Sequence, residues 1–123
     1  NKKFDVIFCN KQESLNISST NNISSAMKFL KEFSKEVIIT SGSEGAYVNH
    51  ENELFHTPSK KANPIDLTGA GDMFLAAYMT AKIKNKNITD RISFANECSA
   101  RIIEKYGAKF DTDRDYQDLR SIL

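Results

Sequence analysis

Residues 66–72, with the sequence Asp-Leu-Thr-Gly-Ala-Gly-Asp, combine a glycine-containing turn with an acid at the start of a predicted helix. Gly69 and Gly71 carry no side chain, so a ligand can approach the backbone there. The free N–H groups and the dipole at a helix start attract an anion such as phosphate. Asp72 would repel that phosphate unless its carboxylate acts on the group with which the phosphate reacts. A general base that takes the proton of an attacking hydroxyl fits this arrangement.

A purely structural role for the same residues stays open from the sequence. A Gly-x-Gly before a helix often serves close packing, and the helix dipole favours an aspartate in the first turn. The chain has no Gly-x-x-x-x-Gly-Lys-Ser/Thr and no Gly-x-Gly-x-x-Gly, which excludes the P-loop and the Rossmann fingerprint. His50 and His56 have no cluster of further ligands near them in sequence, so we expect exposed hairpin histidines rather than a zinc site.

Two short apolar runs and one helical repeat predict the elements that precede this segment. Residues 5–9 and 37–40 are typical of strands buried on both faces. Apolar residues at helical spacing predict a helix over 24–35, with Ser24 as its N-cap. Residues 10–25 are predicted to be a loop that opens a short helix and then, from residue 16, a connection. A strand, a helix and a second strand indicate a βαβ unit with parallel strands.

The rest of the chain adds a hairpin and further helices. A glycine turn at 41–45 is followed by 46–49 and 54–57, which predict a β-hairpin at the edge of the sheet. A long helix is predicted after Gly71. The remaining expected elements are a short strand near 63–65, a helix from an N-cap at Thr89 to a stop at Gly107, and a last helix from about Asp113. The predicted fold class is α/β, a mostly parallel sheet flanked by helices.

The composition is that of a globular chain with nearly balanced charge, and the length fits one domain or part of one. The chain has 123 residues, 40% of them hydrophobic, and 17 basic against 16 acidic residues, a formal net charge of +1. That balance excludes phosphate-driven binding of nucleic acid. No apolar run approaches the ~20 residues of a membrane helix, so no membrane partner is expected. Cys9 and Cys98 are predicted to be reduced, buried thiols, which favours a cytoplasmic protein.

Four motifs of the chain resemble those of the ribokinase-like (PfkB) carbohydrate kinase family. Residues 66–74 are similar to its C-terminal signature, Asp-Thr-x-Gly-Ala-Gly-Asp-x-Phe. Asn-Lys-Gln-Glu at 10–13 resembles its Asn-x-x-Glu, and residues 40–46 resemble its Thr-x-Gly-x-x-Gly nucleotide loop. Residues 94–100, followed by Tyr-Gly-Ala at 106–108, resemble its Ala/Asn-rich helix and the Gly-Ala end of that helix. The resemblance implies a ribokinase-like fold and ATP-dependent phosphorylation of an alcohol on a sugar or nucleoside.

The resemblance also implies roles for individual residues. Asp72 matches the catalytic base, and the backbone of Gly69, Ala70 and Gly71 matches the anion hole for the transferring phosphoryl group. The positions that match contacts to ATP, Mg²⁺ and K⁺ are Asn10 and Glu13 for Mg²⁺ and the phosphates, Thr40 and Gly42 for the ATP phosphates in the loop that ends at Gly45, Asn96 for the adenine pocket, and Asp66 with Thr68 for a monovalent cation such as K⁺.

The chain departs from the family pattern in three places. Leu67 stands where the family usually has Thr or another polar residue, which weakens the K⁺ assignment. Ser41 stands where a larger apolar residue is common. The sequence lacks the family's N-terminal glycine-pair substrate motif and β lid, and it starts at Asn1 rather than Met. We therefore expect residues 1–123 to be the C-terminal, nucleotide-binding part of a kinase.

Three functions stay open at this point. The first is an ATP- and Mg²⁺-dependent kinase for a small hydroxylated substrate, in which the chain needs the missing N-terminal part; a homodimer is one assembly that this function allows. The second is a truncated nucleotide-binding module with no kinase activity of its own. The third is a kinase for a hydroxymethyl pyridine or pyrimidine, although the Asp-x-x-Gly-Ala-Gly-Asp form favours the sugar and nucleoside branch.

Overall fold

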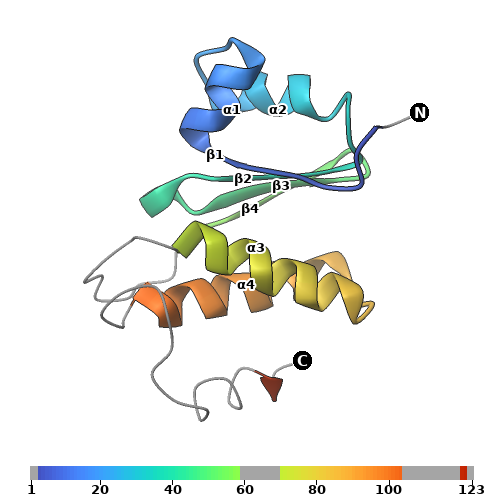
Figure 1. Ribbon diagram of the computed structural model, residues 1–123, viewed down its shortest axis with the longest axis vertical. Helices are drawn as coiled ribbons and strands as arrows, with labels where there is room; N and C mark the ends of the chain where they lie inside the picture. Colours follow the sequence, from blue (N-terminus) through green and yellow to red (C-terminus); the bar gives the residue numbers. More distant parts are fainter. Residues whose placement is uncertain (1–2, 59–69, 104–119, 122–123) are drawn as a thin grey trace. The chain divides into compact units, whose positions relative to one another are not determined.

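The computed structural model describes residues 3–58, 70–103 and 120–121 of the chain (Figure 1). The chain divides into two compact units, Asn1–Pro58 and Ser59–Leu123. Across the three described ranges, no helix is both long enough and apolar enough to cross a membrane.

The first unit contains a four-stranded sheet with the order β1-β2-β3-β4. Its strands are β1 (Ile7–Asn10), β2 (Glu36–Thr40), β3 (Ala46–His50) and β4 (Glu53–Thr57). The strands β1 and β2 are parallel, as the βαβ prediction requires. The predicted hairpin is confirmed as β3 and β4, whose pairs with their neighbours are antiparallel. The described part of the sheet is therefore mixed, and its parallel pair is the part that carries sequence motifs at its ends.

Two helices, α1 (Lys11–Ser18) and α2 (Ile23–Leu30), connect β1 to β2 and cover one face of the sheet (Figure 1). Alternate residues of the strands point toward these helices because side chains of a strand alternate between its two faces. The buried core between helices and sheet consists of Cys9, Ala26, Met27, Leu30, Val37 and Ile39. The helices thus hold the β1–β2 pair from one side and leave its carboxyl ends at the edge of the layer.

The first unit corrects three details of the sequence-based prediction. Helix α1 extends to Ser18, into the stretch predicted as a connection. Asn22, and not Ser24, is the N-cap of α2, because its Oδ1 accepts from the N–H of Ser25 at 2.8 Å. Helix α2 ends at Leu30 rather than near residue 35. Residues 31–33 form turns after the helix, and the Phe33 carbonyl accepts from the backbone N–H groups of Lys3 and Phe4.

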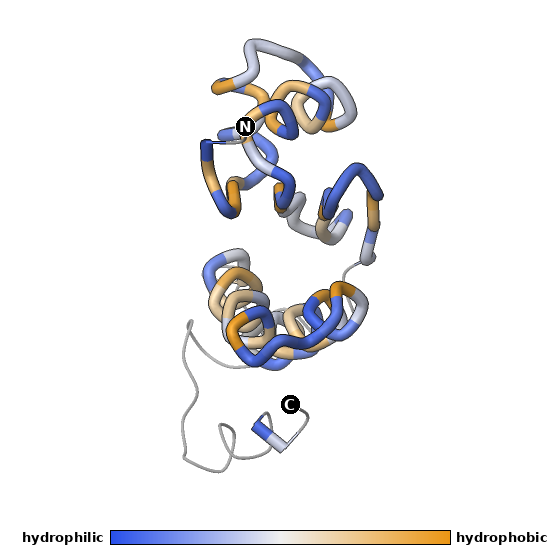
Figure 2. The backbone as a smooth tube through the Cα atoms, turned by 90° about the vertical axis from the view of Figure 1, so that its right-hand side faces the viewer, coloured by the Kyte–Doolittle hydropathy of each residue, from blue (hydrophilic) through white to orange (hydrophobic). Residues whose placement is uncertain are grey.

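The second unit is described as two helices, α3 (Ala70–Ile83) and α4 (Ile88–Ile103), which lie side by side (Figure 1). Helix α3 is mostly apolar, whereas α4 mixes apolar and hydrophilic residues (Figure 2). The turn between them closes on Asn85, which has a left-handed φ of 60°. Its N–H bonds to the Lys82 carbonyl at 2.9 Å, and the next N–H bonds to the Ala81 carbonyl at 3.0 Å. This pair of backbone hydrogen bonds is a common way to end a helix.

The start of α4 differs from the prediction by a short distance. The Oδ1 of Asn87 accepts from the N–H of Asp90 at 2.9 Å, so Asn87 is the N-cap and Thr89 lies inside the helix. The long helix predicted after Gly71 is confirmed as α3, with Phe74, Ala77, Tyr78 and Ala81 buried. The strand expected near 63–65 and the stop at Gly107 lie outside the described residues, as does almost all of the expected last helix.

Candidate active site

The carboxyl ends of β1 and β2 bring two of the sequence motifs together. Asn10 and Thr40 are the last residues of these parallel strands and are paired in register. The loops that leave parallel strands at this edge are the usual ligand sites of α/β sheets. The Asn-x-x-Glu motif follows β1, and the nucleotide-loop motif follows β2. The structure therefore places Asn10, Glu13, Thr40 and Gly42 around one edge of the first unit.

Asn10 and Glu13 form a reciprocal capping box at the start of α1. The Oδ1 of Asn10 accepts from the N–H of Glu13 at 2.8 Å, and the N–H of Asn10 donates to the Oε1 of Glu13 at 2.9 Å. Both residues are exposed. The Oε2 of Glu13 makes no hydrogen bond within the described part of the chain. An exposed carboxylate with one oxygen held and one open is a suitable oxygen ligand for Mg²⁺, directly or through water.

The turn after β2 contains a single 3₁₀ turn, Gly42–Glu44, closed by backbone hydrogen bonds. The N–H of Ser41 donates to the Gly45 carbonyl at 2.7 Å, and the N–H of Gly45 donates to the Gly42 carbonyl at 3.1 Å. Gly42 has a φ of +49°, and nothing lies within 4 Å of the position that a Cβ would take. The open space beside Gly42 agrees with a backbone that a ligand can approach.

The structure explains why position 45 is a glycine. Its φ is +94°, and a Cβ there would meet the carbonyl oxygen of Thr57 and lie 2.7 Å from the Cα of Pro58. The end of β4 thus passes so close to the turn that no side chain fits at this position. The structure assigns Gly45 to the shape of the loop, while its predicted part in cofactor binding stays untested.

Glu44 is the most extensively held residue of this loop. Its carboxylate Oε1 accepts from the Oγ of Ser41 at 3.1 Å and lies 3.6 Å from the Nζ of Lys11 at the start of α1. Its backbone carbonyl lies 2.8 Å from the Nε2 of His56 on β4. The His56 ring also stacks on Tyr47, with centroids 4.5 Å apart and an interplanar angle of 18°.

The expectations from the sequence did not include this network. Both hairpin histidines were expected to be exposed; His56 is exposed, whereas His50 is half-buried. A signal was present in the hairpin, because the register of its two strands places Tyr47 directly opposite His56. The contact from His56 to the Glu44 carbonyl depends on the path of the turn, which the residue pattern does not define.

The second unit holds the acid at a helix start. Ala70, Gly71 and Asp72 form the first turn of α3, where the N–H groups have no partner within the helix. Asp72 is exposed. The Oγ of Ser99 on α4 donates to the Ala70 carbonyl at 3.0 Å and so fixes the first residue of α3 against the neighbouring helix. Asn96 is half-buried and lies one helical turn before Ser99.

The remaining predicted site residues cannot be compared with the structure. Gly69, Asp66 and Thr68 lie outside the described residues. The structure relates the Asn10, Glu13, Thr40 and Gly42 positions within the first unit, and the Gly71, Asp72 and Asn96 positions within the second. Among the residues that the structure describes, no group of three or more His, Cys, Asp or Glu side chains gathers as metal ligands would.

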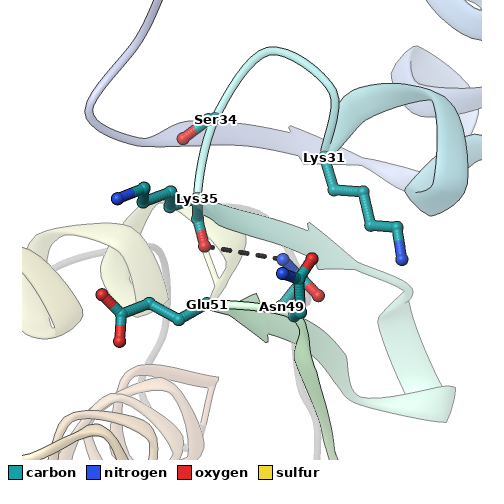
Figure 3. Close-up of a pocket in the computed structure, with 6 residues that line it drawn as sticks. Lys31, Ser34, Lys35, Asn49 and Glu51 are labelled. Atoms are coloured by element: carbon teal, nitrogen blue, oxygen red, sulfur yellow. Dashed lines mark hydrogen bonds between the residues drawn. The ribbon is translucent and has the colours of Figure 1, made fainter. Parts of the chain in front are cut away.

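A pocket of about 210 Å³ lies at the other end of β2 (Figure 3). Six polar residues line it: Lys31, Ser34, Lys35, Asn49, Glu51 and Asn52. The Lys35 carbonyl accepts from the backbone N–H of Glu51 at 2.9 Å and from the Nδ2 of Asn49 at 3.5 Å. None of the residues predicted from sequence lines this pocket, so it is separate from the loops at the carboxyl ends of β1 and β2.

Comparison with known proteins finds the pfkB family of carbohydrate kinases over residues 1–115. A ribokinase from Staphylococcus aureus is 38% identical over 82 residues, which cover 66% of this chain and 27% of the relative. A putative ribokinase II from E. coli, solved in complex with ATP and Mg²⁺, has a TM-score of 0.79 and 27% identity over 96% of this chain and 38% of its own. A double-mutant fructokinase from Vibrio cholerae, solved with fructose, ADP and potassium ion, has a TM-score of 0.74 and 28% identity over 85% of this chain and 36% of its own.

The chain therefore spans about a quarter of the length of the Staphylococcus aureus relative. The family match over residues 1–115 includes all four motifs. The similarity in fold to the E. coli structure covers 96% of the chain. The predicted ribokinase-like α/β fold is confirmed. From its sequence match and its fold, this chain belongs to the PfkB family of carbohydrate kinases.

Proposed function

We propose that the chain supplies the nucleotide-binding part and the general base of an ATP-dependent kinase that acts on an alcohol of a sugar or nucleoside. The observation that carries this proposal is the position of Asp72 in the first turn of α3, inside the family's signature motif. In the proposed reaction the substrate oxygen forms a bond to the γ-phosphorus. The bond from that phosphorus to the leaving oxygen of ADP breaks, and the hydroxyl proton passes to the Asp72 carboxylate.

The start of α3 is suited to the charge that develops in this reaction. Phosphoryl transfer passes through a loose transition state, so positioning and electrostatic stabilisation supply most of the catalysis. The backbone amides of Ala70 and Gly71, with Gly69 before them, are the proposed anion hole. Such amides are fixed before the reaction begins, and a single donor of this kind can contribute ~3 kcal/mol. Ser99 supports them by holding the Ala70 carbonyl from α4.

The proposed nucleotide contacts come mostly from the first unit. Thr40 and Gly42 would meet the ATP phosphates, since they follow β2 at the edge where ligands of α/β sheets bind. Glu13, oriented by Asn10, would hold Mg²⁺, whose charge would neutralise part of the phosphate charge. Asn96 is the proposed contact to adenine. The E. coli relative solved with ATP and Mg²⁺ supports this choice of cofactors.

The assignment of a monovalent cation rests on the signature motif and on one relative. Asp66 and Thr68 are proposed to hold K⁺, and the Vibrio cholerae fructokinase solved with potassium ion supports a monovalent cation in this family.

The homodimer stays a prediction. A cytoplasmic location is proposed because the two cysteines are free and buried, as suits a reducing compartment.

The substitution Asp72→Asn in the full-length protein tests the proposal. It keeps the size of the side chain and removes the base, so kcat should fall by about 10²–10⁴-fold while the KM for ATP changes little. Asp90→Asn is a matched control, because Asp90 is the acidic residue in the first turn of α4. We expect Asp90→Asn to keep the parental kcat. ADP release should be followed with ribose, fructose and adenosine as substrates.

The same measurement can refute the proposal. If Asp72→Asn turns over as fast as the parent with every substrate that the parent phosphorylates, Asp72 is not the base. If both Asp72→Asn and Asp90→Asn lose the same activity, a general effect of first-turn charge explains the loss.

A second candidate function applies to the 123-residue chain by itself. Its match covers only 27% of the Staphylococcus aureus relative, which favours a nucleotide-binding module that phosphorylates nothing alone. The partner would then be the N-terminal, substrate-binding part of the same kinase.

A further inference from the structure

The β3–β4 hairpin touches the proposed nucleotide loop through one side chain, His56. The first pairs of the hairpin are Ala46 with Thr57 and Tyr47 with His56, so His56 lies beside the turn that ends at Gly45. Its Nε2 is 2.8 Å from the Glu44 carbonyl oxygen. A carbonyl oxygen can only accept, so the Nε2 must carry the hydrogen in this contact.

The His56 ring is held in the orientation that this hydrogen bond needs. It stacks on Tyr47 with centroids 4.5 Å apart and planes inclined by 18°. Stacked rings at this separation attract each other, and the stack limits the rotation of both side chains. The Tyr47–His56 pair therefore presents the Nε2–H to the loop with little remaining freedom.

The other contacts of Glu44 leave its backbone carbonyl to His56. Ser41 and Lys11 hold the carboxylate, at 3.1 and 3.6 Å. Gly42, at the start of the same 3₁₀ turn, is exposed and borders open space. The turn is thus fastened on the Glu44 side and accessible on the Gly42 side, which is the arrangement that a preformed phosphate loop requires.

We propose that His56 is a positioning residue that, supported by Tyr47, holds the Ser41–Gly45 turn through the Glu44 carbonyl and so presents Gly42 to the phosphates of ATP. This inference rests on the proposed function, which assigns the turn to the nucleotide. His56 itself does not touch the substrate or the reacting atoms.

Three substitutions in the full-length protein test the role of His56. His56→Phe keeps a ring on Tyr47 and removes the donor, whereas His56→Gln keeps an N–H at nearly the same distance from the backbone and removes the ring. His50→Phe is the matched control, because His50 ends β3 at the far end of the same hairpin. The readouts are amide hydrogen exchange of the peptide covering residues 41–45, and the KM for ATP beside kcat.

We expect His56→Phe to speed exchange in the turn and to raise the KM for ATP by about threefold to tenfold, the effect of one lost hydrogen bond, with kcat nearly unchanged. His56→Gln should recover part of both effects, and His50→Phe should match the parent. A His56→Phe protein with parental exchange and parental KM would overturn the proposal, as would a His56→Gln protein no better than His56→Phe.

The remaining outcome separates this inference from the proposed function. If His56→Phe speeds exchange but leaves the KM for ATP unchanged, His56 anchors the turn and the turn does not serve ATP, so the proposal fails. The test of Asp72 does not depend on this result, because Asp72→Asn is judged by kcat. A fault in the assignment of the base and a fault in the assignment of the loop therefore give different measurements.

Discussion

Single residues at the proposed site also serve local structure. Asn10 caps α1 with its side chain, and its backbone N–H donates to the carboxylate of Glu13. Loss of an N-cap side chain costs about 0.5–2 kcal/mol of stability, so a change at Asn10 would weaken the helix as well as any metal site. A substitution at Asp72 separates function from folding better, because its side chain is exposed and is not part of this capping box.

The two cysteines are both buried, as predicted, and the reactivity of their thiols reports on that burial. Burial, with a smaller effect of the Glu13 charge, raises the pKa of the Cys9 thiol to about 11. Burial also raises the pKa of Cys98 to about 12. At pH 8 the native Cys9 should therefore react with a thiol reagent at least about a hundredfold more slowly than in the urea-unfolded chain, because only the thiolate reacts.

The raised pKa values also set the sign of a pH effect on stability. Native thiols keep their protons to a higher pH than unfolded thiols, whose pKa is near 9.0. The free energy of unfolding should therefore fall as the pH rises from about 9 to about 11 for Cys9 and to about 12 for Cys98. A Cys9→Ala, Cys98→Ala double variant should show a smaller fall over this range. Equal reaction rates in the native and unfolded chains would contradict the burial on which both expectations depend.

At the scale of elements, the nucleotide-loop motif contains two glycines whose surroundings differ. Gly45 has no room for a Cβ against Thr57 and Pro58, whereas Gly42 has open space. Gly45→Ala should therefore lower the free energy of unfolding by about 1–3 kcal/mol or more, the cost of strain with a backbone contact added. Gly42→Ala should lower the free energy of unfolding only by the cost of a left-handed φ, about 1–2 kcal/mol. Urea unfolding of both variants measures the difference, and a Gly42→Ala protein less stable than Gly45→Ala would contradict it.

The boundaries of the helices show where the sequence pattern stopped being sufficient. Ser24 and Thr89 were predicted as N-caps, and in both helices an asparagine two residues earlier takes that place. Asn, Ser and Thr are all good caps, so propensity does not choose among neighbours. The choice depends on where the backbone turns into the helix, which packing of the apolar face decides. Buried strands and the hairpin were predictable because their periodicity extends over several residues.

The parallel pairing of β1 and β2 places the ends of the two strands that carry motifs at one edge of the sheet. The candidate residues at these ends could be named from the sequence through the resemblance of their motifs to the family, and their roles stay predictions. The contact of His56 with the Glu44 carbonyl could not be predicted, because it joins a side chain to a backbone atom 12 residues earlier. Such contacts follow from the three-dimensional path of a turn and leave no repeat in the sequence.

At the scale of the whole molecule, the comparisons limit what this chain is expected to do alone. The chain spans 27% of the Staphylococcus aureus ribokinase and 38% of the E. coli structure. Transfer of a phosphoryl group needs the acceptor hydroxyl within about 3–3.5 Å of the phosphorus, and holding two reactants in such geometry supplies much of the catalysis. Residues that hold a nucleotide therefore do not make a kinase unless further residues hold the sugar.

We expect the 123-residue chain by itself to bind ATP with Mg²⁺ weakly and to release no ADP in response to ribose, fructose or adenosine. Without a second part to fix the acceptor, the hydroxyl would reach the phosphate only by diffusion, and the advantage of about 10⁵ M or more in effective concentration would be lost. A coupled assay for ADP with each substrate measures this, and the Asp72→Asn chain prepared in parallel is the control for contaminating kinases. Release that depends on the sugar and disappears in the Asp72→Asn chain would refute the expectation, because the active site would then be complete within these residues.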